Sequence, residues 1–324
     1  MRNAILVIGS TGKQGGAVIE ALLSAPESLD VPILAVTRNT GTAGAQSLLA
    51  KSPRIKLVKG NLNNCDAIFK AAEVPVKSVF FVPIPTMAPG AKADSEEVQG
   101  KALVDAAVQN DVEHFVFSSV DRHGSDSESS DTDVPHFIAK ARIEKHLQQK
   151  AGTSMTWTIL RPVAFMDNVT TGFAGKIFPT VSSFLLPIKL RSCISLLIRH
   201  IKAWKVGLTP TKKLQLIAAE DIGWFGAQAL LRPKEYAGRG ISLAGDELTF
   251  EEANEIFKKK FGTDIATTFG FVASGLLWAV DDVGKMFKFF EETGYAADIA
   301  GLRKEHPELL SFEKWLDTSV FAHK

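Results

Sequence analysis

The feature that most constrains this chain is a glycine turn close to its start. An apolar run at residues 4–8 leads directly into Gly9, Gly12 and Gly15, which have the spacing GxxGxxG. A helical pattern follows over residues 15–24, and a second apolar run spans residues 33–37. Strand, glycine turn, helix and strand in this order form a unit that holds a dinucleotide pyrophosphate at the helix N-terminus. The sequence therefore predicts a dinucleotide site before it indicates any substrate.

The same alternation of apolar runs and helical patterns continues for about half of the chain. Strands are expected at 4–8, 33–37, 55–58, 78–82, 114–118 and 156–160, and helices at 15–24, 66–72, 96–109 and 136–150. The apolar runs are continuous, as expected for strands that helices cover on both faces. The pattern predicts an α/β fold, namely a Rossmann doubly wound parallel sheet.

The regular alternation of apolar runs and helical patterns ends after residue 160. Short strands are expected at 214–218 and 241–244, and helices at 249–261, 271–293 and 298–304. We therefore expect a dinucleotide-binding Rossmann core at 1–160 and a smaller, mostly helical substrate region at 161–324, interleaved with late strands of the core. A stretch at about 178–206 is interpreted as an insertion. It is apolar and basic by turns, and prolines interrupt it, so we expect a lid or docking surface and no membrane span.

Charge and cysteine content exclude several function classes. Thirty-seven Lys and Arg residues against 36 Asp and Glu residues leave a formal charge of +1, which gives no basic footprint for nucleic acid. Cys65 and Cys193 form no disulfide framework or thiolate metal site, and the histidines lack metal-ligand spacing, so no metal is expected. The first strand begins almost at once, without a signal-peptide pattern. These features favour a cytoplasmic protein.

The end of the second apolar run indicates which dinucleotide is bound. A protein that binds NAD presents an acid there to the ribose 2′-hydroxyl, whereas this chain presents Arg38, followed by Asn39. A guanidinium can pair with a 2′-phosphate through two hydrogen bonds, so the sequence predicts NADP(H). Lys13 in the glycine turn would add a second cation. The alternative is that Arg38 is a solvated loop residue.

The chain resembles the NmrA-like family of atypical short-chain dehydrogenases/reductases, particularly its fungal oxidoreductase-like members. The resemblance covers nearly the whole chain outside the insertion. Its motifs are GSTGKQGG at 9–16, VTRN at 36–39, KGNL at 59–62, PHFIAK at 135–140, LRPVAFMDN at 160–168, AEDIG at 219–223 and LAGDELT at 243–249.

The resemblance implies where an NADP(H) molecule would lie. The pyrophosphate would contact Gly9, Ser10, Thr11, Gly12, Lys13, Gln14 and Gly15, and the adenosine phosphate would contact Arg38 and Asn39. Asn61 and Leu62 would lie beside the adenine; many relatives have Asp at the first of these positions. Val82 and Pro83 would line the cofactor ribose, and Lys140 would reach the nicotinamide ribose. The nicotinamide end would be surrounded by Phe165, Met166, Asp167 and Asn168.

The expected catalytic helix departs from the ordinary short-chain dehydrogenase pattern. Those enzymes use a Tyr four residues before a Lys, which places both side chains on one helix face. Here the spacing survives as His136 and Lys140, so the acid or base is predicted to be an imidazole. Ser118 or Ser119 would bind a substrate carbonyl oxygen. The alternative is that His136 only packs at the helix start.

These residues and the family resemblance together imply two possible functions. The first is an NADP(H)-dependent oxidoreductase that acts on a small organic carbonyl or enone substrate, in a setting of secondary metabolism. The second is a non-catalytic sensor that reads NADP(H) occupancy and passes it to a regulatory protein partner, as the regulatory members of the family suggest.

Overall fold

The centre of the molecule is a parallel sheet whose strand order is that of a Rossmann fold. The computed structural model describes residues 4–28, 30–83, 94–152, 154–168, 203–265 and 281–322. These form a seven-stranded sheet in the order β3-β2-β1-β4-β5-β6-β9, and every neighbouring pair is parallel. The strands are β1 (Ala4–Ile8), β2 (Ile33–Thr37), β3 (Ile55–Lys59), β4 (Val76–Phe81), β5 (His114–Ser118), β6 (Thr156–Pro162) and β9 (Arg239–Leu243).

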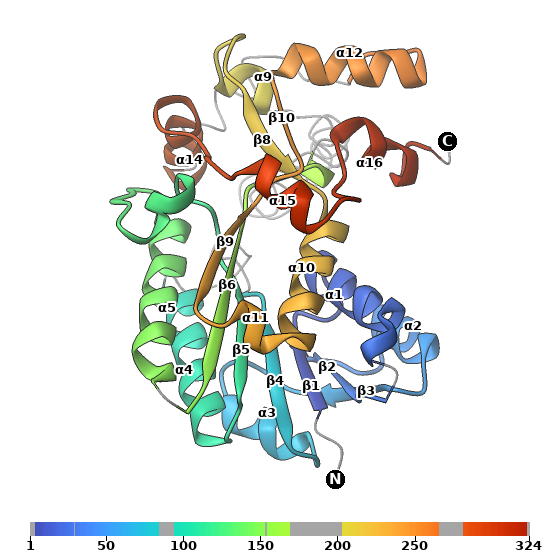
Figure 1. Ribbon diagram of the computed structural model, residues 1–324, viewed down its shortest axis with the longest axis vertical. Helices are drawn as coiled ribbons and strands as arrows, with labels where there is room; N and C mark the ends of the chain where they lie inside the picture. The colour runs from blue at the N-terminus through green and yellow to red at the C-terminus, as the bar shows by residue number, and fades with distance from the viewer. Residues whose placement is uncertain are drawn as a thin grey trace, which may run out of the picture.

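Helices cover both faces of this sheet, which explains why the strands are apolar throughout. In β1, Leu6 packs into one core and Val7 into the other, because successive side chains point to opposite faces. Figure 1 shows α4 and α5 on one side of the sheet and α1 and α10 on the other. The helices of this part are α1 (Lys13–Ser24), α2 (Ala43–Lys51), α3 (Cys65–Ala71), α4 (Ser95–Gln109), α5 (Pro135–Ala151), α10 (Ala219–Leu231) and α11 (Pro233–Tyr236).

A second, smaller unit lies beyond the carboxyl ends of the strands (Figure 1). Its three-stranded sheet has the order β10-β8-β7, and its own apolar core includes Phe257, Phe289 and Trp315. No helix in the described ranges is long and apolar enough to cross a membrane. The elements of this unit are β7 (Ala164–Phe165), β8 (Leu214–Ile217), β10 (Asp246–Leu248), α9 (Ala203–Gly207), α12 (Phe250–Phe261), α14 (Asp281–Glu292), α15 (Ile299–Glu305) and α16 (Phe312–Thr318).

The predicted elements are present, with shifted bounds and some additions. The expected helix at 15–24 begins at Lys13, and the expected strand at 78–82 spans Val76–Phe81. The helix α2 was missed; only Ala45 and Leu48 are buried on it, so its apolar pattern is weak. The expected strand at 214–218 joins the small sheet instead of the large one. Most of the predicted insertion, residues 178–202, and the first part of the expected helix at 271–293 lie outside the described residues.

A buried carboxylate ties the two units together. Asp121, which follows β5 and is 0% exposed, accepts hydrogen bonds from the backbone N–H of Gly124 (2.8 Å) and from the Ser242 hydroxyl of β9 (2.5 Å). Its other oxygen accepts from the N–H of Ala296 (3.1 Å), just before α15. Because a buried carboxylate is costly unless it is hydrogen-bonded, these contacts fix the C-terminal segment against β5 and β9.

Candidate functional site

A cavity of about 780 Å³ lies along the carboxyl ends of the parallel strands. Residues that directly follow β1, β4 and β5 line it, namely Gly9, Val82 and Ser119. Open α/β sheets bind their ligands at this edge. Most of the predicted site residues are brought together here: Gly9, Thr11, Gly12, Lys13, Gln14, Arg38, Asn39, Asn61, Leu62, Val82, Pro83, His136, Lys140, Phe165 and Asn168.

Two positions of the glycine turn are packed too tightly against the protein to carry a side chain. Gly9 has a φ of +79°, which disfavours a side chain, and a Cβ there would collide with Val82. A Cβ on Gly15 would collide with the carbonyl oxygen of Gly9, so this glycine lets α1 pack against the turn. Gly12 is the N-cap of α1, and no side chain caps that end of the helix. The turn therefore fits a pyrophosphate held by backbone N–H groups at a helix N-terminus.

Arg38, which directly follows β2, gives the cavity wall a cationic position. The exposed Arg38 side chain lines the cavity and forms no ion pair within the described ranges. The Asn39 side chain accepts a hydrogen bond from the N–H of Gly41 (2.9 Å), and Thr42 caps α2 by accepting from the N–H of Ala45 (3.3 Å). Thr42 also lines the cavity, although the sequence did not single it out. Arg38 and the start of α2 thus form a position suited to an anion.

Five predicted residues lie beside the cavity without lining it, most of them in contact with residues that do. The Ser10 hydroxyl donates to the Val36 carbonyl (2.8 Å), and the Ser118 hydroxyl donates to the Gln14 side chain (2.5 Å). Asp167 forms an ion pair with Lys13. The five residues are Ser10, Gly15, Ser118, Met166 and Asp167; Met166 is 0% exposed and belongs to the core of the smaller unit.

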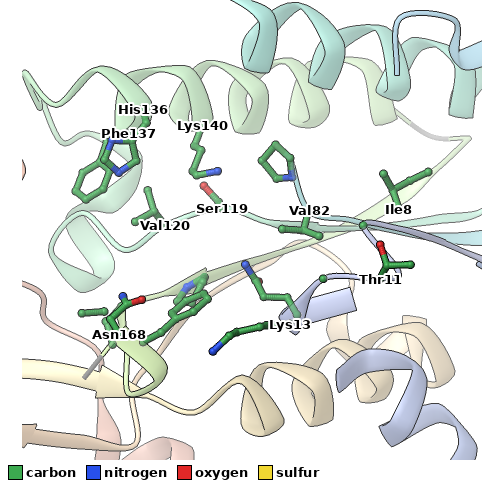
Figure 2. Close-up of a pocket in the computed structure, with 18 of the residues that line it drawn as sticks. Ile8, Thr11, Lys13, Val82, Ser119, Val120, His136, Phe137, Lys140 and Asn168 are labelled. Carbon is green, nitrogen blue, oxygen red and sulfur yellow. The ribbon is translucent and has the colours of Figure 1, made fainter. Parts of the chain in front are cut away.

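The predicted catalytic pair faces the cavity from α5. His136 and Lys140 lie one turn apart on the cavity side of this helix, and Lys140 extends toward Ser119 (Figure 2). Lys140 Nζ donates to Glu96 Oε1 (2.5 Å), and His136 Nδ1 is 2.5 Å from Asp282 Oδ1. The sequence predicted neither partner, because Glu96 is 44 residues away and Asp282 is 146 residues away along the chain.

A buried charge cluster around Glu144 contacts the cavity wall through Ser119. Glu144 accepts hydrogen bonds from Arg122 (2.9 and 3.0 Å), from Arg161 (2.8 Å) and from the Ser119 hydroxyl. Burial alone would raise the pKa of Glu144, but the two guanidinium groups outweigh it and hold the pKa below its ordinary value. Because Ser119 directs its proton to Glu144, it offers lone pairs to the cavity instead of a hydrogen-bond donor.

Beyond His136 the cavity becomes apolar and aromatic. Phe287 and Phe290 of α14 are both buried and line the cavity. Burial and then the charge of Asp121 raise the pKa of Tyr295 well above its usual value, so its phenol stays protonated. The described lining residues of this compartment are Trp204, Leu214, Leu216, Phe250, Ile265, Met286, Phe287, Phe290 and Tyr295.

Two other chemistries find little support in the described part of the chain. It contains no group of three or more His, Cys, Asp or Glu side chains that could hold a metal ion. Cys65, at the start of α3, is 6% exposed, and burial followed by the charge of Asp66 raises the pKa of its thiol to about 11. A thiol with so high a pKa is a poor nucleophile at neutral pH.

Comparison with known proteins gives the family. The NmrA-like family model matches residues 1–321. The chain belongs to the NmrA-like family. Among its curated relatives, the NmrA-like family domain-containing oxidoreductase FrzB from a Cladobotryum species is 26% identical over 301 residues, which cover 90% of this chain and 84% of that protein.

Solved structures share the NmrA-like fold at lower identity. Citrobacter sp. triphenylmethane reductase, solved with NADP(H), has a TM-score of 0.68 at 16% identity, with 98% of this chain and all of that chain covered. NmrA, a negative transcriptional regulator solved with NADP, has a TM-score of 0.67 at 16% identity, with 100% and 97% covered. NmrA solved with NAD has the same TM-score at 17% identity and the same coverage. At these identities the likeness shows the fold alone.

Proposed function

We propose that this NmrA-like protein is an NADP(H)-dependent oxidoreductase that transfers hydride to or from an apolar carbonyl or enone compound. The observation that carries this proposal is the single cavity that joins the glycine turn to the aromatic compartment. His136 and Lys140 of α5 line the same cavity. A nicotinamide extending from the glycine turn would meet an apolar substrate beside a histidine, which is the arrangement that a hydride and proton transfer requires.

The cavity wall offers a contact for each part of NADP(H). In the proposal, the backbone from Gly9 to Gln14 holds the pyrophosphate, and Arg38 with the start of α2 holds the 2′-phosphate. Lys140 binds the nicotinamide ribose while Glu96 keeps its ammonium in place. Phe165 and Asn168 border the nicotinamide. The structures of a reductase with NADP(H) and of a regulator with NADP or NAD on this fold support a dinucleotide ligand, and the choice of NADP(H) rests on Arg38.

The chain's own residues would complete the reaction. When bound, the dinucleotide supplies or accepts the hydride. His136 donates a proton to the substrate oxygen in the reducing direction and removes it in the oxidising direction. Ser118 would act indirectly, because its hydroxyl holds the side chain of Gln14, which lines the cavity. The aromatic residues would exclude water from the substrate.

Turnover of a panel of apolar ketones, aldehydes and enones with NADPH tests the proposal. The His136→Gln variant is expected to lose about 10²- to 10⁴-fold in kcat, the range for a lost general acid. His146→Gln is the matched control, because His146 lies on the same helix, 2.9 Å from a carboxylate oxygen of Asp105, and does not line the cavity. Equal activity in the two variants would remove His136 from the mechanism.

A second function is favoured by the ion pairs at the site. Lys13, His136 and Lys140 are each paired with a carboxylate of the chain itself, an arrangement that also suits a binding site without chemistry. NmrA, with the same fold, is a regulator. In this alternative, NADP(H) binding is passed to a regulatory protein partner. Tight NADPH binding with no turnover of any panel compound would support the sensor and contradict the enzyme.

A further inference from the structure

We propose that Asp282 is a positioning residue for His136, fixing the ring so that Nε2 carries the exchanged proton. This inference rests on the proposed function, in which His136 is the acid or base. Asp282 lies in the first turn of α14, whereas His136 lies near the start of α5. The two residues are 146 positions apart in the chain, and no motif links them.

The contact is short and largely shielded from water. His136 Nδ1 and Asp282 Oδ1 are 2.5 Å apart, and the two side chains are only 11% and 14% exposed. The imidazole also meets the Phe137 ring edge-on at 4.6 Å, and Phe137 in turn meets Phe289 of α14 edge-on at 5.3 Å. The ring of His136 is therefore held by a hydrogen bond and by aromatic packing, and α14 contributes to both.

The chemistry of the partner decides which nitrogen is free. An ionised carboxylate only accepts hydrogen bonds, so Nδ1 must carry a hydrogen whether the imidazole is neutral or charged. The proton that His136 exchanges must then sit on Nε2. His136 lines the cavity, so this nitrogen is the one available to a substrate.

The proton transfer balances without any further reactant. In the reducing direction, the dinucleotide provides the hydride to the substrate carbon, and the electron pair of the C=O bond moves to oxygen. The Nε2–H bond breaks as the O–H bond forms, which leaves a neutral imidazole with its Nδ1–H still directed at Asp282. Nε2 then regains a proton from water.

Other charges near His136 are already balanced by partners. On α5, Lys140 is paired with Glu96 of α4. On α14, Asp281 is paired with Lys285 at 2.7 Å, and Lys285 also interacts with the charges of Asp133, which precedes α5, and of Asp282. Among these groups, Asp282 makes the direct contact with the imidazole.

The first test compares two neighbouring carboxylates. Asp282→Asn is expected to lower kcat by at least about 10-fold and by up to about 10⁴-fold, the loss that follows when Asn replaces the carboxylate partner of a catalytic histidine. The KM for NADPH should stay at its wild-type value, because Asp282 does not line the cavity. Asp281→Asn is the matched control: this side chain is 72% exposed and is paired with Lys285, so kcat should stay at its wild-type value. A kcat for Asp282→Asn that matches Asp281→Asn would overturn the proposal.

Two further measurements separate this inference from the proposed function. In a His136→Gln background, Asp282→Asn should cause no additional loss of kcat, because the two residues act as one unit. Nitrogen NMR of labelled protein should show the neutral His136 ring protonated at Nδ1 in the wild type and shifted toward a mixture of tautomers in Asp282→Asn. If turnover is absent altogether, the proposed function fails, and the NMR comparison still decides the role of Asp282. A wild-type ring protonated at Nε2 would overturn that role.

Discussion

Arg38 is the single residue on which cofactor preference depends most directly. Replacing it by Asp puts a negative charge where the 2′-phosphate is expected to bind. A hydrogen bond to a charged group contributes roughly 1.5–3 kcal/mol, so NADP affinity should fall by about 10- to 100-fold or more. NAD affinity should change little, because NAD has a hydroxyl at this position. Calorimetric titration with both dinucleotides measures the difference, and equal losses would contradict the 2′-phosphate assignment.

The buried residue His114 leads to a prediction of how the free energy of unfolding depends on pH. It is 1% exposed at the start of β5, between the hydroxyls of Thr156 (2.8 Å) and Thr158 (3.1 Å), and burial lowers its pKa from 6.5 to about 4. The unfolded chain therefore binds more protons than the folded protein between these two values. The free energy of unfolding should fall as the pH drops through this window, by up to about 3 kcal/mol.

Urea unfolding measured at pH 7, 5.5 and 4.5 checks the effect of His114. The slope with pH should be smaller in His114→Gln, which keeps polar atoms near both threonines and cannot titrate. Asp and Glu side chains also titrate at the acid end of this range. The effect of His114 is therefore the difference in slope between the wild type and His114→Gln. An identical slope in both would show that His114 does not contribute to it.

At the scale of elements, the turn between β1 and α1 sets how closely the helix approaches the sheet. A Cβ on Gly15 would collide with the Gly9 carbonyl oxygen, so Gly15→Ala must push α1 outward. Overpacking of this kind costs about 1–3 kcal/mol, and NADPH binding should weaken because the helix N-terminus moves. Gly44→Ala is the matched control, since a Cβ there meets nothing within 4 Å. Its stability should stay level or rise by up to about 1 kcal/mol. Thermal unfolding of both variants and NADPH titration of Gly15→Ala measure these changes.

How well an element could be predicted depended on how local its signal is. The glycine turn lies between Gly9 and Gly15, so its motif could be recognised directly in the sequence. The strands of the large sheet carry long apolar runs because helices cover both of their faces. By contrast, α2 buries only two residues and gave too weak a pattern. The same difference holds for the site. The cavity residues near the glycine turn could be predicted from motifs, whereas Asp282 and Tyr295 reach the site only because distant segments pack together.

At the scale of the whole molecule, the cavity exists because two chain halves meet at the carboxyl edge of one sheet. The Rossmann part contributes every charged side chain among the described lining residues, namely Lys13, Arg38 and Lys140, together with His136. The C-terminal part contributes the aromatic wall. No pattern in the sequence relates these halves, since pairs such as Asp121 with Ala296 span 175 positions. Their juxtaposition is a property of the folded chain.

The position of β9 has a consequence for how such proteins diversify. This strand comes from the C-terminal half yet pairs with β6 at the edge of the large sheet, and α10 of the same half packs against α1. A chain cut after residue 160 would lose both, so the halves are poor candidates for exchange as separate blocks between relatives. Recombination at that boundary would break the sheet. New substrate preferences in this architecture are therefore expected to arise by point changes in the aromatic wall.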